Sequence, residues 1–157
     1  MTKKRKKKKI EPEQERYEIE VEDWELAYRF ELNTGPKDLV EGVFWEHSRL
    51  ILTGKILSPI VEKASSAKIE IASKPHMDDH WETEPTIKSA KAIGWMEIPR
   101  GEDTLTFYCL IPSRSLPSII LAAGLSMIKF VSISGTKLKW RQGTISSVSL
   151  SKAREEF

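Results

Sequence analysis

The sequence contains a single cysteine, Cys109, among its 157 residues. No disulfide can therefore form within the chain, and no zinc site can be built from cysteine alone. Glycine and proline are also sparse, with eight of each, which excludes a collagen-like chain. The most apolar stretch, 116–133, is interrupted by polar residues and by Lys129, so we expect no membrane span there. The hydrophobic fraction of 39% is nevertheless sufficient for one packed domain.

The start of the chain lacks the apolar run that a secretory signal requires. A basic stretch is present, but it leads into Glu11, Glu13 and Glu15 instead of into hydrophobic residues. We therefore expect a cytoplasmic protein that does not bind membranes and keeps Cys109 reduced.

Charge is strongly segregated along the chain, although the formal net charge is only +2. Residues 10–31 contain nine acidic and two basic residues, a net charge of −7. Seven consecutive cations precede them: Lys3, Lys4, Arg5, Lys6, Lys7, Lys8 and Lys9. Because like charges repel and nothing in this stretch can be buried, residues 1–15 are predicted to form a disordered arm.

Residues 17–32 alternate between apolar and polar side chains, which is typical of a half-buried strand. The apolar positions are odd-numbered as far as Val21 and even-numbered from Trp24 onward. Such a change of phase requires either a bulge or a break into two strands. The polar positions of the first part form an acidic face of Glu18, Glu20 and Glu22.

Further strands are predicted from β-branched, aromatic and alternating patterns bounded by turn residues. The expected ranges are 43–57, 68–72, 91–98, 104–111, 127–133, 137–141 and 144–150, with a helical turn over 60–66 and turns at 134–136 and 142–143. The last three strands would form a meander, and Cys109 would lie in a buried strand. Gly54 marks a bend, and 73–89 reads as a long loop.

One helix is predicted over 115–123, near the middle of the most apolar stretch. Ser115 is placed to cap its start, and Gly124 stands where a C-terminal glycine is favoured. Because residues 119–123 carry no charge, we expect this helix to be buried on most sides. The sequence as a whole predicts an all-β, mainly antiparallel sandwich or barrel of about eight strands with one short helix. Residues 16–151 would form a single domain between the arm and a charged tail, 152–157.

The basic arm is the clearest functional feature, because seven cations in a row suit a polyanion. We expect nucleic acid as its partner, with an inert solvating tail and an anionic membrane surface as the alternatives. A second basic element, 137–141, would place three cations on one face of a strand and Trp140 on the other. Lys129 on a neighbouring strand could extend this patch. Strand lysines also protect sheet edges, so the patch alone is weak support. The candidate nucleic-acid contacts outside the arm are Lys137, Lys139 and Arg141.

One cluster in the predicted loop 73–89 has metal-ligand chemistry. Imidazole and carboxylate groups suit zinc, manganese or iron. The spacing lacks the glutamate of a metalloprotease motif, and flanking prolines disfavour a helix that would align the histidines. A solvated acidic loop is the simpler interpretation. The candidate ligands are His76, Asp78, Asp79 and His80, with His47 as a distant addition.

Four of the five tryptophans, Trp24, Trp45, Trp95 and Trp140, occur in strand contexts and are expected to pack on the sheet. The fifth, Trp81, lies in the predicted loop and could contact a partner.

The sequence therefore favours a non-enzymatic module that binds nucleic acid through its arm, and no cofactor is expected. No nucleophile motif or phosphate-binding loop is present. The alternatives are a metal-dependent enzyme using the histidine loop and a protein-interaction or oligomerisation module. The last would use Trp81 or the acidic face of Glu18, Glu20 and Glu22.

Overall fold

The computed structural model describes residues 11–32, 34, 44–73 and 92–154. These residues form a closed barrel of seven strands with one short helix, which confirms the predicted all-β class and selects the barrel over the sandwich. The elements in chain order are β1 (Gln14–Leu32), β2 (Phe44–Ser58), β3 (Ser66–Ser73), β4 (Gly94–Glu97), β5 (Thr104–Ile111), η2 (Ser113–Ser115), α2 (Leu116–Gly124), β6 (Phe130–Thr136) and β7 (Gln142–Ser151).

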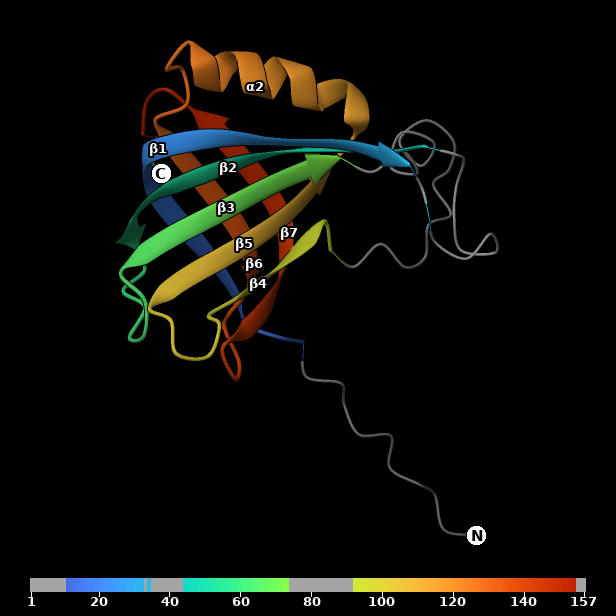
Figure 1. Cartoon of the computed structure of the whole chain (residues 1–157). Coiled ribbons are helices and arrows are strands. Elements are labelled where there is room, and N and C mark those ends of the chain that lie inside the picture. Colours follow the sequence, from blue (N-terminus) through green and yellow to red (C-terminus); the bar gives the residue numbers. More distant parts are fainter. Residues whose placement is uncertain (1–10, 33, 35–43, 74–91, 155–157) are drawn as a thin grey trace, which may run out of the picture.

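The strands follow the order β1-β2-β3-β5-β4-β7-β6 around the barrel, which closes where β6 pairs with β1. Neighbouring strands are antiparallel except for β3 and β5, which run parallel. The helix α2 lies across one end of the barrel, and the loops between β4 and β5 and between β6 and β7 lie at the other end (Figure 1).

The phase change in the first strand is accommodated by a bulge, so β1 remains one strand. Its pairing with β2 shifts register between Val21 and Asp23. Before the shift β1 also pairs with β6, over Gln14–Glu20, and after it β1 continues along β2 alone to Leu32. The bulge therefore allows one long strand to close the barrel and then run past it.

The interior is filled by the apolar positions of the alternating pattern. Ile69 and Ile71 of β3 point inward and are fully buried, as predicted. The ring of Tyr17 packs edge-on against Phe107, with 5.5 Å between ring centroids. Other fully buried side chains come from almost every strand: Ile19, Leu50, Leu52, Met96, Leu105, Ile133 and Ile145.

The helix forms where the sequence predicts it, but its surroundings differ. Within α2 only Leu116 and Ala123 are buried, whereas the side chain of Leu121 is 64% exposed. The prediction of burial on most sides was wrong because α2 covers one end of the barrel and presents only one side to it. Within the described residues no helix is long and apolar enough to cross a membrane.

The predicted helix caps also differ from the structure. Ser115 is the N-cap residue but makes no side-chain capping hydrogen bond, and Gly124 lies inside the helix. The left-handed backbone conformation after the helix belongs to Ser126, with φ 55°.

Several predicted boundaries were wrong. Residues 60–66 form a turn closed by a bridge between Val61 and Ala64 and not a helical turn. The strand expected at 91–98 is shortened to β4, and that expected at 127–133 begins at Phe130. The turns expected at 134–136 and 142–143 lie within β6 and β7.

Residues 137–141 form a loop where a strand was expected, so the predicted meander is a hairpin of β6 and β7. The alternation of Lys-Leu-Lys-Trp-Arg imitates a strand, but the chain must reverse direction there. Trp140 and Arg141 accordingly have positive φ values, 54° and 69°.

Candidate nucleic-acid interface

The hairpin loop between β6 and β7, residues 137–141, places Trp140 on the surface. Its side chain is 88% exposed, so the prediction that Trp140 packs on the sheet was wrong. A positive φ turns the backbone at this residue out of the strand path. Lys139 on the same loop is also exposed, and its backbone pairs with Gln142 to close the hairpin. A cation and an exposed aromatic ring are thus neighbours at the loop tip.

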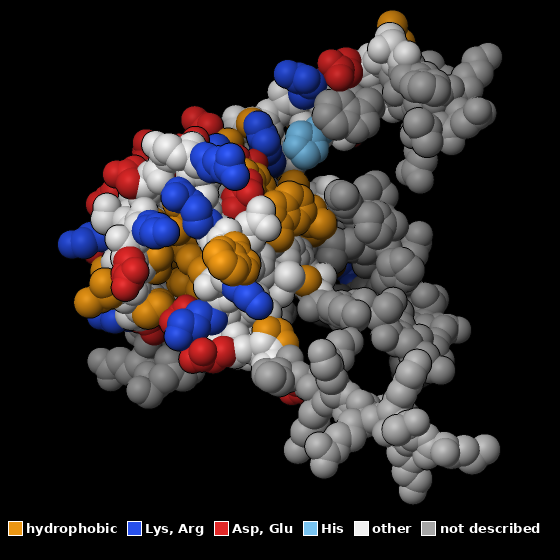
Figure 2. Space-filling model, turned by 90° about the horizontal axis from the view of Figure 1, so that it is seen from below, with side chains coloured by type: hydrophobic (Ala, Val, Ile, Leu, Met, Phe, Trp, Pro, Cys, Tyr) orange, Lys and Arg blue, Asp and Glu red, His pale blue; other side chains and the backbone are white. Residues whose placement is uncertain are grey.

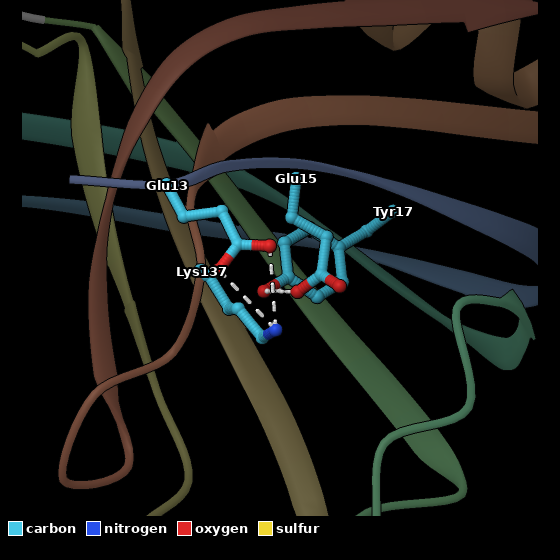
Figure 3. A network of polar contacts seen from close by, with 4 residues as sticks. All are labelled: Glu13, Glu15, Tyr17 and Lys137. Atoms are coloured by element: carbon cyan, nitrogen blue, oxygen red, sulfur yellow. Dashed lines mark hydrogen bonds and ion pairs between the residues drawn. The ribbon is translucent and has the colours of Figure 1, made fainter.

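The same loop is attached to the last residues of the predicted arm. The prediction of disorder was wrong for Gln14 and Glu15, because they already pair with β6 as the start of β1. The backbone N–H of Lys137 donates to the carbonyl oxygen of Glu13 at 2.7 Å, and the Lys137 Nζ lies 3.4 Å from the Glu13 carboxylate. Figure 3 shows this contact beside the hydrogen bond from the Tyr17 hydroxyl to Glu15 Oε2, 2.9 Å long. The first described residues, from Glu11, therefore leave the barrel next to the 137–141 loop (Figure 1).

Tyr17 links this surface to the core. Its ring is fully buried, and burial together with the hydrogen bond to Glu15 raises the pKa of its hydroxyl above the usual range. The hydroxyl therefore stays protonated and continues to donate to Glu15. Both residues belong to β1, so this bond orders the Glu15 side chain beside the Glu13–Lys137 contact.

Arg141 has a structural task that the strand prediction missed. Its guanidinium donates to three backbone carbonyls: Ile98 at 2.8 Å, Pro99 at 2.7 Å and Glu102 at 3.1 Å. These bonds join the 137–141 loop to the β4–β5 turn. Lys129 lies at the opposite end of β6, next to α2, so it does not extend a patch with Lys137 and Lys139. The predicted basic face of a strand was therefore wrong.

The end of the barrel that carries these loops has mixed charge. Figure 2 shows Lys and Arg side chains interspersed with Asp and Glu on this face, with hydrophobic side chains between them. The described residues therefore present no continuous basic surface here. Lys3–Lys9 lie outside the described residues, but they adjoin this end in sequence.

A shallow groove of about 420 Å³ lies on the outer face of β2, β3 and β5. Thr53, Lys68, Thr106 and Tyr108 contribute to its wall. Tyr108 also stacks on Trp95 of β4, with 4.8 Å between ring centroids.

This groove is poorly suited to phosphate. Glu22 and Glu102 line it, and Lys68 is already paired with the nearly buried Glu70 at 2.7 Å. Burial, followed by the carboxylates of Glu97 and Glu70, raises the pKa of Tyr108. Among the lining residues, the single cation Lys68 is thus already paired and two carboxylates remain, which disfavours a nucleic-acid backbone.

The catalytic alternatives find little support in the described residues. Among the residues of these ranges, no three His, Cys, Asp or Glu side chains are placed to hold a metal ion. Cys109 is fully buried, and burial raises the pKa of its thiol to about 12, so it remains a protonated core residue. The predicted metal ligands His76, Asp78, Asp79 and His80, and the predicted partner contact Trp81, lie outside the described residues.

The acidic face of β1 is partly occupied. The carboxylate of Glu18 accepts two hydrogen bonds from the Arg154 guanidinium, the shorter at 2.8 Å. Glu20 is exposed, and Glu22 lines the outer groove.

Sequence reasoning missed the exposure of Trp140, and no local signal pointed to it. The Gln-Gly pair after Arg141 favours a turn at 142–143, which assigns 137–141 to a strand. Comparison with known proteins finds no matching family model, no significantly similar curated protein and no significantly similar solved structure.

Proposed function

We propose that this protein is a non-enzymatic module that binds single-stranded nucleic acid at the barrel end opposite α2. Lys3–Lys9 would contact the phosphates, and the 137–141 loop would supply a stacking surface. The observation that carries the proposal is the 88% exposure of Trp140 beside Lys139, on a loop bonded to the root of the arm.

The two parts supply different contributions to binding. Cations that neutralise phosphates release condensed counterions, which gives affinity without sequence preference and a steep dependence on salt. An exposed aromatic ring accepts an unpaired base by stacking, worth about 1–3 kcal/mol per base. Bases in a duplex are already stacked, so only a single strand can use Trp140 fully.

The attachment of the loop to Glu13 supports a shared ligand for both parts. Because Lys137 holds Glu13 through the backbone and the side chain, a nucleic-acid strand bound by Lys3–Lys9 would be able to reach Trp140. Arg141 keeps the loop in this position by its three bonds to carbonyl oxygens. We therefore assign Arg141 a positioning role and leave phosphate contact to the lysines.

The test is a titration of full-length protein against a labelled single strand and the matching duplex at roughly 50 and 200 mM salt, which span steep counterion release. We expect the single strand to bind more tightly, with a salt slope of about −0.7 per contacted phosphate. A chain starting at Glu11 should lose most of this slope. Trp140→Ala should weaken single-strand binding about 5- to 100-fold and leave the salt slope unchanged.

Trp95→Ala provides the matched control, since Trp95 is a partly exposed tryptophan on the outer face of β4. It should retain single-strand affinity. Absence of binding by the full-length chain would refute the proposal. Equal losses for Trp140→Ala and Trp95→Ala would refute the role of the loop.

A further inference from the structure

The two longest strands continue past the barrel as an apolar ribbon. β2 pairs with β3 only over Arg49–Lys55, whereas β1 and β2 remain paired as far as Leu32 and Phe44. In Figure 1 the arrow of β1 accordingly runs well beyond the end of β3. We call residues 28–32 and 44–48 the ribbon.

One face of the ribbon and of the adjoining part of β1 is mainly apolar and exposed, with Glu46 and Ser48 of β2 as its polar members. The even-numbered positions of β1 after the bulge share this face with Phe44 of β2. Six large apolar residues on this face are each between 41% and 62% exposed: Trp24, Leu26, Tyr28, Phe30, Leu32 and Phe44. We call these six side chains the ribbon face.

Two contacts order three of the six side chains. The rings of Phe30 and Phe44 stack with 5.4 Å between centroids and an angle of 24°. The Tyr28 hydroxyl donates to Glu46 Oε1 at 3.1 Å, so burial of Tyr28 by a partner would not leave its hydroxyl without a hydrogen bond. A partner would therefore meet a preorganised surface and lose little side-chain entropy there.

The C-terminal end of α2 lies beside Trp24. The Trp24 ring lies 4.0 Å from the position that a Cβ would occupy at Gly124. Leu121 and Leu125 are 64% and 62% exposed, but they lie on the side of the helix turned away from the buried Leu116 and Ala123. The two leucines are therefore not part of the ribbon face.

The ribbon face is as large as the largest apolar patch of a typical folded monomer, about 300–600 Å². Aromatic side chains carry about 150–250 Å² each, so four half-exposed aromatic rings and two half-exposed leucines offer roughly 600 Å². This area reaches the lower end of the roughly 600–1,000 Å² that each partner buries in a specific interface. Two-stranded ribbons are also marginally stable by themselves, so a packed partner would stabilise this one.

We infer that the ribbon face packs against the ribbon face of a second copy of this chain, about a two-fold axis. In such an interface the same patch serves both partners, so both ribbons lose their exposed apolar surface together. A membrane fits less well, because Glu25 and Glu31 of the same strand would repel anionic lipid. The surface lies away from the 137–141 loop, so the dimer would leave that loop free and present two basic arms.

The first experiment measures the mass of the full-length protein by light scattering after size-exclusion chromatography, from roughly 1 to 100 μM, the range in which micromolar dissociation is visible. We expect twice the mass of one chain at the upper concentrations. Phe30→Lys places a charge in the centre of the interface and should raise the dimer dissociation constant at least tenfold. A monomer of the unchanged protein at every concentration would overturn the inference.

Ile60→Lys is the matched control, because Ile60 is 97% exposed on the β2–β3 turn. It should leave the dissociation constant unchanged, and an equal effect of both substitutions would overturn the inference. Amide exchange of the unchanged protein supplies a second readout that needs no variant. Protection over 28–32 and 44–48 should rise with protein concentration, and protection that does not change with concentration would also count against the dimer. Neither readout involves nucleic acid, so the outcome is separate from that of the proposed function.

Discussion

At the scale of single residues, β1 and β2 approach each other closely at the bulge because Gly54 has no side chain. Gly54 is buried opposite Val21, and a Cβ there would overlap the backbone carbonyl oxygen of Glu20. The glycine therefore permits a close approach of two backbones within one continuous strand, where the sequence suggested a bend.

We predict that Gly54→Ala lowers the free energy of unfolding by about 2–3 kcal/mol, because backbone atoms must move to make room. Gly124→Ala is the matched control, since its Cβ would only touch the Trp24 ring at 4.0 Å. In a helix this change should be neutral or stabilising by up to about 1 kcal/mol. Urea unfolding of both variants measures the difference, and equal stabilities would contradict the close approach.

Buried titratable groups make the protein sensitive to alkali. Burial raises the pKa of Cys109 from its ordinary value of 9.0 to about 12, and the pKa of Tyr17 is raised as well. Between pH 9 and 12 the unfolded chain loses the Cys109 proton while the folded chain keeps it. The free energy of unfolding is therefore expected to fall as the pH rises through this range.

We predict that Cys109→Ala removes part of this pH dependence. The variant should be less stable than the parent at pH 8 because it leaves a small cavity, yet its stability should decline less steeply above pH 9. Urea midpoints between pH 8 and 11 test the slope. Parallel pH profiles for parent and variant would show that Cys109 does not contribute.

At the scale of elements, α2 shows how composition can mislead about burial. An uncharged helix suggests a core position, but this helix covers the end of a barrel and contacts it through one side. Leu116 is only 3% exposed, whereas Leu121 is 64% exposed on the same helix. The two leucines therefore differ in what they contribute to stability.

We predict that Leu116→Ala lowers the free energy of unfolding by about 2–5 kcal/mol, the usual cost for a buried leucine. Leu121→Ala should change it by less than about 1 kcal/mol, because its side chain stays largely in water when the chain is monomeric. Urea unfolding at low protein concentration keeps dimer formation from contributing. A large loss for Leu121→Ala under these conditions would mean that α2 is buried more deeply.

Strands with a clean period of two could be located from sequence, and the reason is local. β3 buries the two isoleucines that its alternation assigns to the core, and β5, which was predicted from its apolar run, has the predicted bounds. The 137–141 loop could not be recognised in the same way, because its alternation is equally compatible with a strand. Only the pairing of β6 with β7 forces the reversal there, and with it the exposure of Trp140.

At the scale of the whole molecule, the seven consecutive cations and the contacts that stabilise the barrel lie in different parts of the chain. The described contacts of the barrel begin at the pair of Glu13 with Lys137 and the buried ring of Tyr17. The seven cations of residues 3–9 precede both. Charge can therefore be removed without removing any of these contacts.

We predict that a chain starting at Glu11 keeps the free energy of unfolding of the parent within about 0.5 kcal/mol, as is usual for changes away from packed features. Its net charge should change from +2 to −5, because the shortened chain contains 18 basic and 23 acidic residues. Isoelectric focusing should move the protein from a basic to an acidic position. A marked loss of stability would show that the arm packs on the barrel.

The sequence by itself determined the all-β class, most of the strands, core positions such as Ile69, Ile71 and Cys109, and the charge of the arm. These features follow from local periodicity and composition, which the folded environment does not alter. Tertiary structure alone decided the closure of the barrel, because β1 meets β6 and β3 meets β5 across distant parts of the chain. It also decided which apolar side chains remain exposed to water. Trp140 projects from the loop where the chain reverses direction, and the ribbon face lies where β1 and β2 extend beyond the ends of the neighbouring strands. Exposure depends on what the rest of the chain covers, and that is a property of the assembled barrel.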